Sequence, residues 1–163
     1  MNADVSFETK ILTPETLAEG VARLPRPIVM TNGVFDILHR GHATYLARAR
    51  ALGASLVVAV NSDASVRMLG KGEDRPINRQ EDRAALVAAL ESVDAVVVFK
   101  EKVPLAVLEA VRPDIYVKGA DYAGKPLPER DLVQSWGGRV ELIAFEHDTS
   151  TTKTLERIRA SKA

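Results

Sequence analysis

The sequence predicts a single doubly wound α/β domain with a five-stranded parallel sheet, spanning residues 1–163. Two observations lead to this prediction. Short apolar runs rich in Val and Ile alternate with amphipathic runs, the pattern of strands joined by helical crossovers. Such crossovers are right-handed and make the strands that they join parallel. The length of 163 residues fits one domain with its own core. The expected architecture is therefore Rossmann-like.

An arm and a helix are expected to precede the sheet. Residues 1–12 carry mixed charge with little pattern, which indicates an arm. A helix should follow from Thr13 to Leu24, because Thr13 can cap it and Pro14 suits a first turn. Together these segments make an N-terminal region of residues 1–27, and residues 28–163 make the core of the domain.

Five apolar runs are predicted to form the sheet, each bounded by polar or turn-forming residues. They are residues 28–30, 55–60, 94–99, 115–117 and 140–145. The third run ends at Phe99 and continues into Lys100 and Glu101, without the small or hydroxylic residues that follow the other four. We therefore expect the third strand to lie at the edge of the sheet.

The helices are predicted from apolar spacing and capping signals. They cover about residues 41–52, a short segment around Val66, and residues 78–91, 104–111 and 128–136, with a last helix after 148–152. The helix from Gly41 should bury Leu46, Ala49 and Leu52 and end at Gly53. The helix from Asn78 should bury Leu86, Val87 and Leu90, and Asn78 with Glu81 has the spacing of a capping box.

Composition excludes several classes of function. Lys and Arg total 22 against 22 for Asp and Glu, so no net charge favours a nucleic acid or an anionic membrane. The absence of cysteine excludes a disulfide scaffold, a thiolate nucleophile and a cysteine-based metal site. No stretch has the apolar length of a signal peptide core or a membrane span, so we expect a soluble, cytoplasmic protein.

Polar residues at the strand ends are expected to face one another across a crevice, because open α/β sheets bind ligands at that edge. The richest segment is Thr31 to His42, where a strand turns into a helix. His39 and His42 would share one face of the first helical turn, whose backbone N–H groups are unpaired, and Gly41 lies between them. Such a turn suits phosphate. The other strand ends are Asn61 to Asp63, Lys118 to Asp121 and Asp148 to Thr152.

The remaining strand ends and one loop add further groups for phosphate. Ser150, Thr151 and Thr152 form a hydroxyl-rich helix start that can donate to a second phosphate oxygen. Lys118 and the loop residue Lys71 can place cations beside a transferring phosphorus. The chain has no Walker loop and no Gly-x-Gly-x-x-Gly, and no nucleophile with an adjacent base, so the chemistry predicted is direct transfer between two bound partners.

Each of these residues also has a purely structural interpretation. Ser150 to Thr152 can be a simple helix cap, and Asn61 and Asp63 can cap a helix too. Residues 70–76 contain two glycines, a proline and four charges, so Lys71 and Arg75 taken singly suit an exposed, mobile, solvated loop. Arg83 can be a surface ion-pair partner, and His147 a surface residue.

The motifs Gly33-Val34-Phe35-Asp36, His39-Arg40-Gly41-His42 and Ser150-Thr151-Thr152 resemble the Gly-x-Phe-Asp, His-x-Gly-His and Ser-Thr-Thr elements of the nucleotidyltransferase superfamily. Within it, the segments around Thr31, Asn61, Arg75 and Lys118 resemble the adenylyltransferases of ADP-heptose synthesis. This resemblance covers residues 24–159. It implies transfer of AMP from ATP to D-glycero-β-D-manno-heptose 1-phosphate, with release of pyrophosphate, for lipopolysaccharide core synthesis.

The resemblance also implies roles for single residues. His39, His42 and Lys71 are the implied catalytic residues, and Asn61, Asp63 and Lys71 the implied contacts to the sugar phosphate. The implied contacts to the nucleotide and its phosphates are Thr31, Asn32, Gly33, Val34, Phe35, Asp36, Gly41, Arg83, Lys118, Gly119, Asp121, Ser150, Thr151 and Thr152. Mg²⁺ is expected with ATP, held by phosphate and water and by no protein cage.

The resemblance finally implies partners and alternatives. The partners are small molecules, ATP and a sugar 1-phosphate, and no nucleic acid or membrane. A homo-oligomer is expected, as is a separate heptose kinase, because the chain lacks the kinase domain that many members carry. Ala120 stands where the subfamily usually has glycine. The alternatives are a cytidylyltransferase acting on a small phosphorylated alcohol such as glycerol 3-phosphate, and a non-catalytic nucleotide-binding module.

Overall fold

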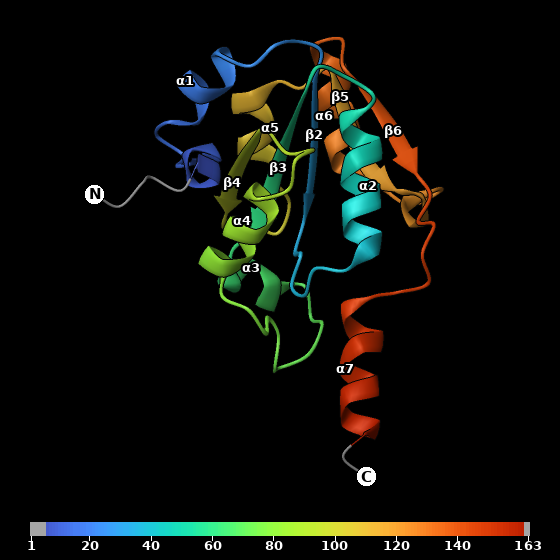
Figure 1. Cartoon of the computed structure of the whole chain (residues 1–163). Coiled ribbons are helices and arrows are strands. Elements are labelled where there is room, and N and C mark those ends of the chain that lie inside the picture. Colours follow the sequence, from blue (N-terminus) through green and yellow to red (C-terminus); the bar gives the residue numbers. More distant parts are fainter. Residues whose placement is uncertain (1–5, 162–163) are drawn as a thin grey trace, which may run out of the picture.

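The structure is a computed structural model that describes residues 6–161. Its centre is a six-stranded parallel sheet in the order β1-β4-β3-β2-β5-β6 (Figure 1). The strands are β1 (Ile11–Leu12), β2 (Ile28–Gly33), β3 (Ser55–Asn61), β4 (Ala95–Phe99), β5 (Ile115–Gly119) and β6 (Arg139–Ile143). All seven residues of β3 are buried, as expected for a strand covered on both faces. The predicted parallel α/β architecture is confirmed.

Helices cover both faces of the sheet. The longer ones are α2 (Arg40–Arg50), α4 (Gln80–Ala88), α6 (Pro128–Ser135) and α7 (Thr151–Ala160), and the shorter ones α1 (Leu17–Ala22), α3 (Asp63–Met68) and α5 (Leu105–Val111). Short 3₁₀ helices span Ser6–Lys10 and Ala120–Tyr122. One core cluster packs α2 and α4 on the sheet, and a second packs α1, α5 and α6 on the opposite face. Helix α7 projects away from the sheet in Figure 1, and of its residues only Thr151 is buried. No helix in residues 6–161 has the length and apolar character needed to cross a bilayer.

Two predictions about the sheet are wrong. The sheet has six strands because Ile11 and Leu12, in the predicted arm, pair with Val96 and Val97 of β4. As a result β4 lies between β1 and β3, one strand in from the edge. A two-residue strand is too short to show any periodicity in sequence, so only its pairing reveals it.

Several helix predictions also need correction. Helix α1 begins at Leu17, because Thr13 and Thr16 first form a hydrogen-bonded turn. Leu52 is 38% exposed and Leu86 is 48% exposed, so neither is buried as predicted. No capping box forms at Asn78, since Arg79 is the N-cap of α4 and the Asn78 amide donates to the Asp36 carbonyl (2.5 Å).

Gly53 is expected not to tolerate a side chain. The reason is not the predicted one, because Gly53 is not the C-cap of α2. Helix α2 ends at Arg50 with Ala51 as its C-cap, and a Cβ added to Gly53 would lie 2.6 Å from the Pro27 carbonyl oxygen. That carbonyl accepts hydrogen bonds from Ala54 and Ser55, which fixes the start of β3 beside β2. We expect Gly53→Ala to lower the free energy of unfolding by about 1–3 kcal/mol, because backbone must move. Urea denaturation measures this, and an unchanged midpoint would contradict it.

Candidate active site

The turn from β2 into α2 is built around an unusual backbone conformation. Phe35 has a φ of 49°, in the left-handed region, and its ring lies against Gly33, where an added Cβ would approach within 2.9 Å. Non-glycine residues adopt this conformation rarely, and often at functional sites. The turn brings Val34 and Phe35 to the cavity wall and leads directly to His39, the N-cap of α2.

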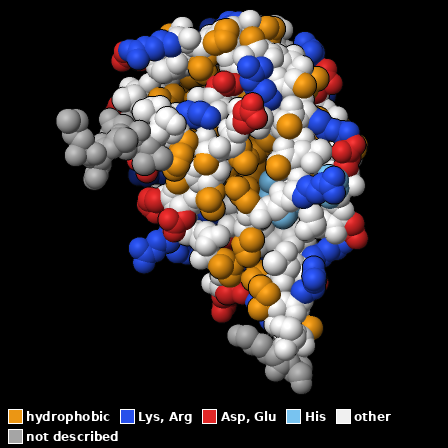
Figure 2. All heavy atoms as spheres, viewed as in Figure 1, with side chains coloured by type: hydrophobic (Ala, Val, Ile, Leu, Met, Phe, Trp, Pro, Cys, Tyr) orange, Lys and Arg blue, Asp and Glu red, His pale blue; other side chains and the backbone are white. Residues whose placement is uncertain are grey.

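His39 and His42 form a stacked pair at the start of α2. Their ring centroids lie 3.8 Å apart with planes 21° apart, and the edge of the Phe35 ring packs on His42. The Nδ1 atoms of both rings are buried and have no hydrogen-bond partner in residues 6–161. Figure 2 shows histidine atoms reaching the surface between hydrophobic side chains and a group of Lys and Arg side chains. Both rings therefore retain a nitrogen that can form a hydrogen bond to a ligand.

Burial keeps these imidazoles neutral near pH 7. Burial, together with the neighbouring charges of His39 and Lys71, lowers the pKa of His42 to about 4. Burial also lowers the pKa of His39. A bound polyanion would oppose this shift, because negative charge favours the protonated imidazole. The pair can thus donate hydrogen bonds and gain positive charge as a ligand arrives.

A cavity of about 440 Å³ opens at the carboxyl ends of β2, β3 and β5. Ten predicted residues line it: Asn32, Gly33, Val34, Phe35, His42, Asn61, Lys71, Lys118, Gly119 and Asp121. Sequence reasoning did not single out Tyr45, Lys102, Tyr122, Glu129 or Phe145, which line it too. Tyr45 lies within α2, Glu129 in the first turn of α6 and Tyr122 in the 3₁₀ helix after β5, whereas Lys102 and Phe145 lie in connections, so only the fold brings these five to one crevice.

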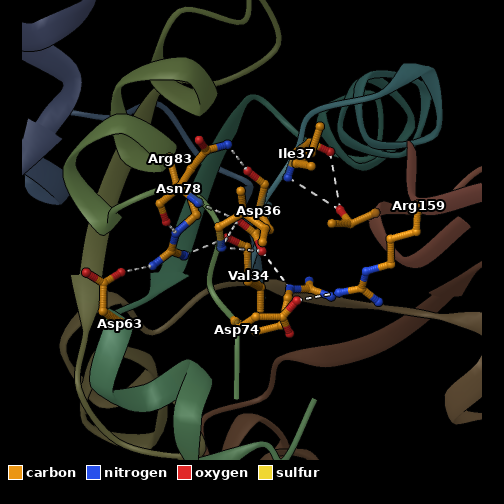
Figure 3. A network of polar contacts seen from close by, with 11 residues as sticks. Val34, Asp36, Ile37, Asp63, Asp74, Asn78, Arg83 and Arg159 are labelled. Atoms are coloured by element: carbon orange, nitrogen blue, oxygen red, sulfur yellow. Dashed lines mark hydrogen bonds and ion pairs between the residues drawn. The ribbon is translucent and has the colours of Figure 1, made fainter. Parts of the chain in front are cut away.

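Asp36 holds the predicted loop rather than facing the cavity. Its carboxylate is 1% exposed and accepts hydrogen bonds from Arg75 Nε (2.7 Å), Ile77 N (3.0 Å) and Asn78 N (2.9 Å) (Figure 3). Burial by itself would raise the pKa of Asp36, but these hydrogen bonds and the Arg75 charge hold it below its ordinary value. Arg75, predicted as solvated, is 7% exposed. The loop of residues 70–76 is therefore anchored at Arg75. Lys71, earlier in the same loop, lines the cavity.

Arg83 and Asp63 pair with each other and do not line the cavity. Arg83 is fully buried, donates to Asn78 O, Val34 O and Asp63 Oδ1 within 2.9 Å, and joins α4 to the turn after β2 (Figure 3). The surface interpretation of Arg83 is therefore wrong, and its guanidinium is engaged with protein oxygens. Thr31 is likewise internal, bonded to Tyr45 OH (2.9 Å) and to the Val117 carbonyl (2.8 Å).

The start of α7 lies beside the start of α2, outside the cavity lining. The Ser150 hydroxyl accepts a hydrogen bond from Lys153 N and so caps α7. Thr151 Oγ1 lies 3.4 Å from both Ile37 N and Ile37 O, and Thr152 is exposed. A Cβ added to Gly41 would lie 3.6 Å from the Thr149 side chain, so two helix N-termini lie next to each other here. Paired N-termini form a favourable environment for phosphate.

One wall of the cavity is polar. Asn32 Oδ1 accepts from Tyr116 OH (2.6 Å) and Lys118 Nζ (3.2 Å), and Glu129 Oε1 lies 3.9 Å from Lys118 Nζ. Burial lowers the pKa of Lys118, whereas Glu129 and Asp121 oppose that change, and Lys118 also lies over the Tyr122 ring at 4.2 Å. The wall therefore combines a cation, a carboxylate and an amide.

Another part of the cavity lining is aromatic. Tyr45 and Phe145 stack with centroids 5.3 Å apart, and Phe145 is 54% exposed. A Cβ added to Gly119 would collide with the Phe145 ring and the Asp121 carboxylate, so the glycine lets the chain pass under the ring. Ala120 has no positive φ and therefore does not need glycine's conformational freedom. An aromatic wall of this kind suits a planar base.

No group of three or more His, Asp or Glu side chains within residues 6–161 is arranged to bind a metal ion. The polar lining of the cavity instead includes three lysines, His42 and two Asn amides, which suit a polyanion, together with the carboxylates of Asp121 and Glu129.

A family model described as cytidylyltransferase-like matches residues 30–163. The chain belongs to the cytidylyltransferase-like family. Its similarity to the D-beta-D-heptose 1-phosphate adenylyltransferase of Bordetella bronchiseptica is 59% identity over 155 residues, covering 94% of this chain and 96% of that protein. This cytidylyltransferase-like chain is 49% identical to the bifunctional protein HldE of Koribacter versatilis, of which it spans only 31%. The resemblance predicted from the motifs is confirmed.

The structure of this chain also matches a solved structure. It is a lipopolysaccharide core biosynthesis protein from Thermoplasma volcanium, with a TM-score of 0.61 and 33% identity, covering 75% of this chain and 98% of that one.

Proposed function

We propose that the chain is a D-glycero-β-D-manno-heptose 1-phosphate adenylyltransferase. The observation that carries the proposal is the 59% identity to the Bordetella bronchiseptica enzyme over nearly the whole of both chains. The cavity supports it, because cationic and hydrogen-bonding groups for phosphates meet an aromatic wall that suits a base.

In this reaction a phosphate oxygen of the sugar 1-phosphate attacks the α-phosphorus of ATP. A new P–O bond forms to that oxygen, the bond from the α-phosphorus to the bridging oxygen breaks, and pyrophosphate leaves with the electron pair. The protein does no covalent chemistry, so catalysis consists of positioning and charge stabilisation. Mg²⁺ bound with ATP, held by phosphate oxygens and water, would supply positive charge at the leaving pyrophosphate.

The residues divide this work between them. His42 donates a hydrogen bond to the oxygens of the α-phosphorus, where negative charge grows in the transition state, and His39 supports it from the stacked position. Lys71 brings a cation from the anchored loop, and Lys118 brings another from β5. The adjacent N-termini of α2 and α7 hold the outer phosphates, with Thr151 at their junction.

Turnover with purified protein tests the proposal. Pyrophosphate release is measured with ATP or CTP, each crossed with heptose 1-phosphate, glycerol 3-phosphate and buffer alone. We expect release with ATP and heptose 1-phosphate together, and formation of ADP-heptose by mass spectrometry. Turnover confined to CTP with glycerol 3-phosphate would replace the proposal by a cytidylyltransferase. ATP binding without turnover on any acceptor would favour a non-catalytic module.

The reaction fixes the chemistry that must precede it. Because the acceptor carries an anomeric phosphate, a kinase acting on a heptose must supply it, and we propose that a separate protein or chain does so. A cytoplasmic location and a homo-oligomeric state remain predictions from the sequence.

A further inference from the structure

Glu129 is a buried carboxylate that faces the cavity. It lies in the first turn of α6, is 4% exposed, and lines the crevice beside Asn32 and Lys118 at the ends of β2 and β5. Carboxylates are rarely buried this deeply unless their oxygens are engaged. Both carboxylate oxygens of Glu129 are therefore expected to accept hydrogen bonds.

Those hydrogen bonds are incomplete. Tyr116 OH carries one proton and lies 2.6 Å from Asn32 Oδ1 but 3.2 Å from Glu129 Oε1, so it can serve only one of them at a time. Asn32 Oδ1 cannot donate, and the shorter distance assigns the proton to it. Lys118 Nζ is 3.9 Å from Oε1, which is an ion pair without a good hydrogen bond.

Two groups of this cluster have no protein partner. Within residues 6–161, no hydrogen bond ends on Glu129 Oε2 and none starts from Asn32 Nδ2. The acceptor and the donor belong to two residues that line the cavity and share Tyr116 and Lys118 as neighbours, and both have free hydrogen-bonding capacity. Lys118 adds a cation held by Asn32. A sugar hydroxyl both donates and accepts, so a pair of neighbouring hydroxyls complements this arrangement.

We propose that Asn32, Lys118 and Glu129 form the subsite that binds neighbouring ring hydroxyls of the sugar phosphate, with Glu129 as the residue that selects a polyhydroxylated acceptor. This proposal rests on the proposed function. Selectivity follows because an acceptor without the matching hydroxyl leaves Glu129 Oε2 shielded from water and without a hydrogen-bond donor. Asp63 was expected to contact the sugar, but its carboxylate is paired with Arg83 outside the cavity.

The position of the cluster favours the acceptor over the ribose of ATP, which carries the same hydroxyl chemistry. The aromatic pair Tyr45 and Phe145, which suits the base, lies on the side of α2 and β6. Glu129 comes from α6, which packs on the opposite face of the sheet, and Lys102 at the start of the connection to α5 lines the cavity with it. The cavity thus has an aromatic side and a hydroxyl-binding side.

Calorimetric titration tests the subsite without requiring turnover. The ligands are heptose 1-phosphate, its 2-, 3- and 4-deoxy analogues, and ATP, each titrated into wild type, Glu129→Gln and the control Asp131→Asn. Asp131 is an exposed carboxylate on the same helix. We expect Glu129→Gln to weaken heptose 1-phosphate about tenfold or more and ATP less than twofold, whereas Asp131→Asn changes neither.

The analogues give a second measurement, whose first part uses wild type alone. Wild type should bind at least one deoxy analogue about tenfold more weakly than heptose 1-phosphate, and Glu129→Gln should lose that discrimination. Weaker ATP binding with unchanged sugar binding would overturn the proposal by assigning Glu129 to the ribose, and equal affinities throughout would overturn it outright. Failure of the proposed function would be a distinct result. In that case the sugar phosphate would bind in a way that depends on Glu129, but wild type would form no nucleotide sugar.

Discussion

Replacing His42 by alanine is expected to lower kcat by about two orders of magnitude or more, with little change in the binding of ATP. The ring stands at the wall of the cavity with its pKa lowered to about 4 by burial, and its Nδ1 has no partner in residues 6–161. An interaction that strengthens as charge grows on the α-phosphorus contributes to kcat more than to ground-state binding. The measurement is steady-state pyrophosphate release with ATP and heptose 1-phosphate at saturation.

The controls separate catalysis from packing. His42 also packs on Phe35 and His39, so circular dichroism and a thermal melt must show that the variant is folded. His147→Ala removes the third histidine, which contacts Thr44 Oγ1 outside the cavity lining, and should leave kcat within about twofold. A His42→Ala variant with wild-type kcat would remove His42 from the catalytic role.

The second large effect is expected on stability. Asp36→Asn should lower the free energy of unfolding by about 3–5 kcal/mol, because it leaves the buried Arg75 guanidinium without its counter-charge. Both partners are shielded from water, with side-chain exposures of 7% and 0%, so solvent does not replace the lost interaction. Urea denaturation followed by circular dichroism measures the change.

The exposed pair between Asp74 and Arg159 is the matched control, since it links the same loop to α7 (Figure 3). Asp74→Asn should cost no more than about 1 kcal/mol, as exposed ion pairs do. The Asp36 variant should also raise KM for the sugar phosphate, because the loop that carries Lys71 loses its anchor. Equal stability of the two variants would contradict the assignment of Asp36 as the anchor.

Titration of the Asp36 carboxyl is also expected to make the free energy of unfolding depend on pH. Its pKa in the folded protein is held below the ordinary value of 3.8 by the Asn78 and Ile77 N–H groups and by Arg75, against the effect of burial. A carboxyl with a lowered folded pKa contributes stability above its unfolded pKa and loses it as pH falls through the folded value. The unfolding free energy of wild type should therefore fall below about pH 4, and more steeply than that of Asp36→Asn. Parallel pH profiles would exclude Asp36 as the titrating group.

The sequence predicted most of the elements but few of the polar contacts. Apolar runs located β2 to β6, because buried strands leave a clear pattern, whereas the pairing of Ile11 with Val96 left none. The exposed Leu86 and Leu52 show that apolar spacing alone does not place a helix face. Asp36 was recognised from its motif, yet its role as the anchor of Arg75 depends on contacts across 39 positions of sequence.

What the sequence by itself determined is the parallel α/β class and the strand-to-helix turn from Thr31 to His42, for which phosphate binding is predicted, because strand periodicity, helix starts and the spacing of His39 and His42 are local properties. Only the tertiary structure decided which side chains share the cavity. In the folded chain Arg83 pairs with Asp63, and Glu129 lines the cavity beside Asn32 and Lys118. These contacts join residues far apart in the chain, and their geometry depends on strand order and helix packing, which no local pattern encodes.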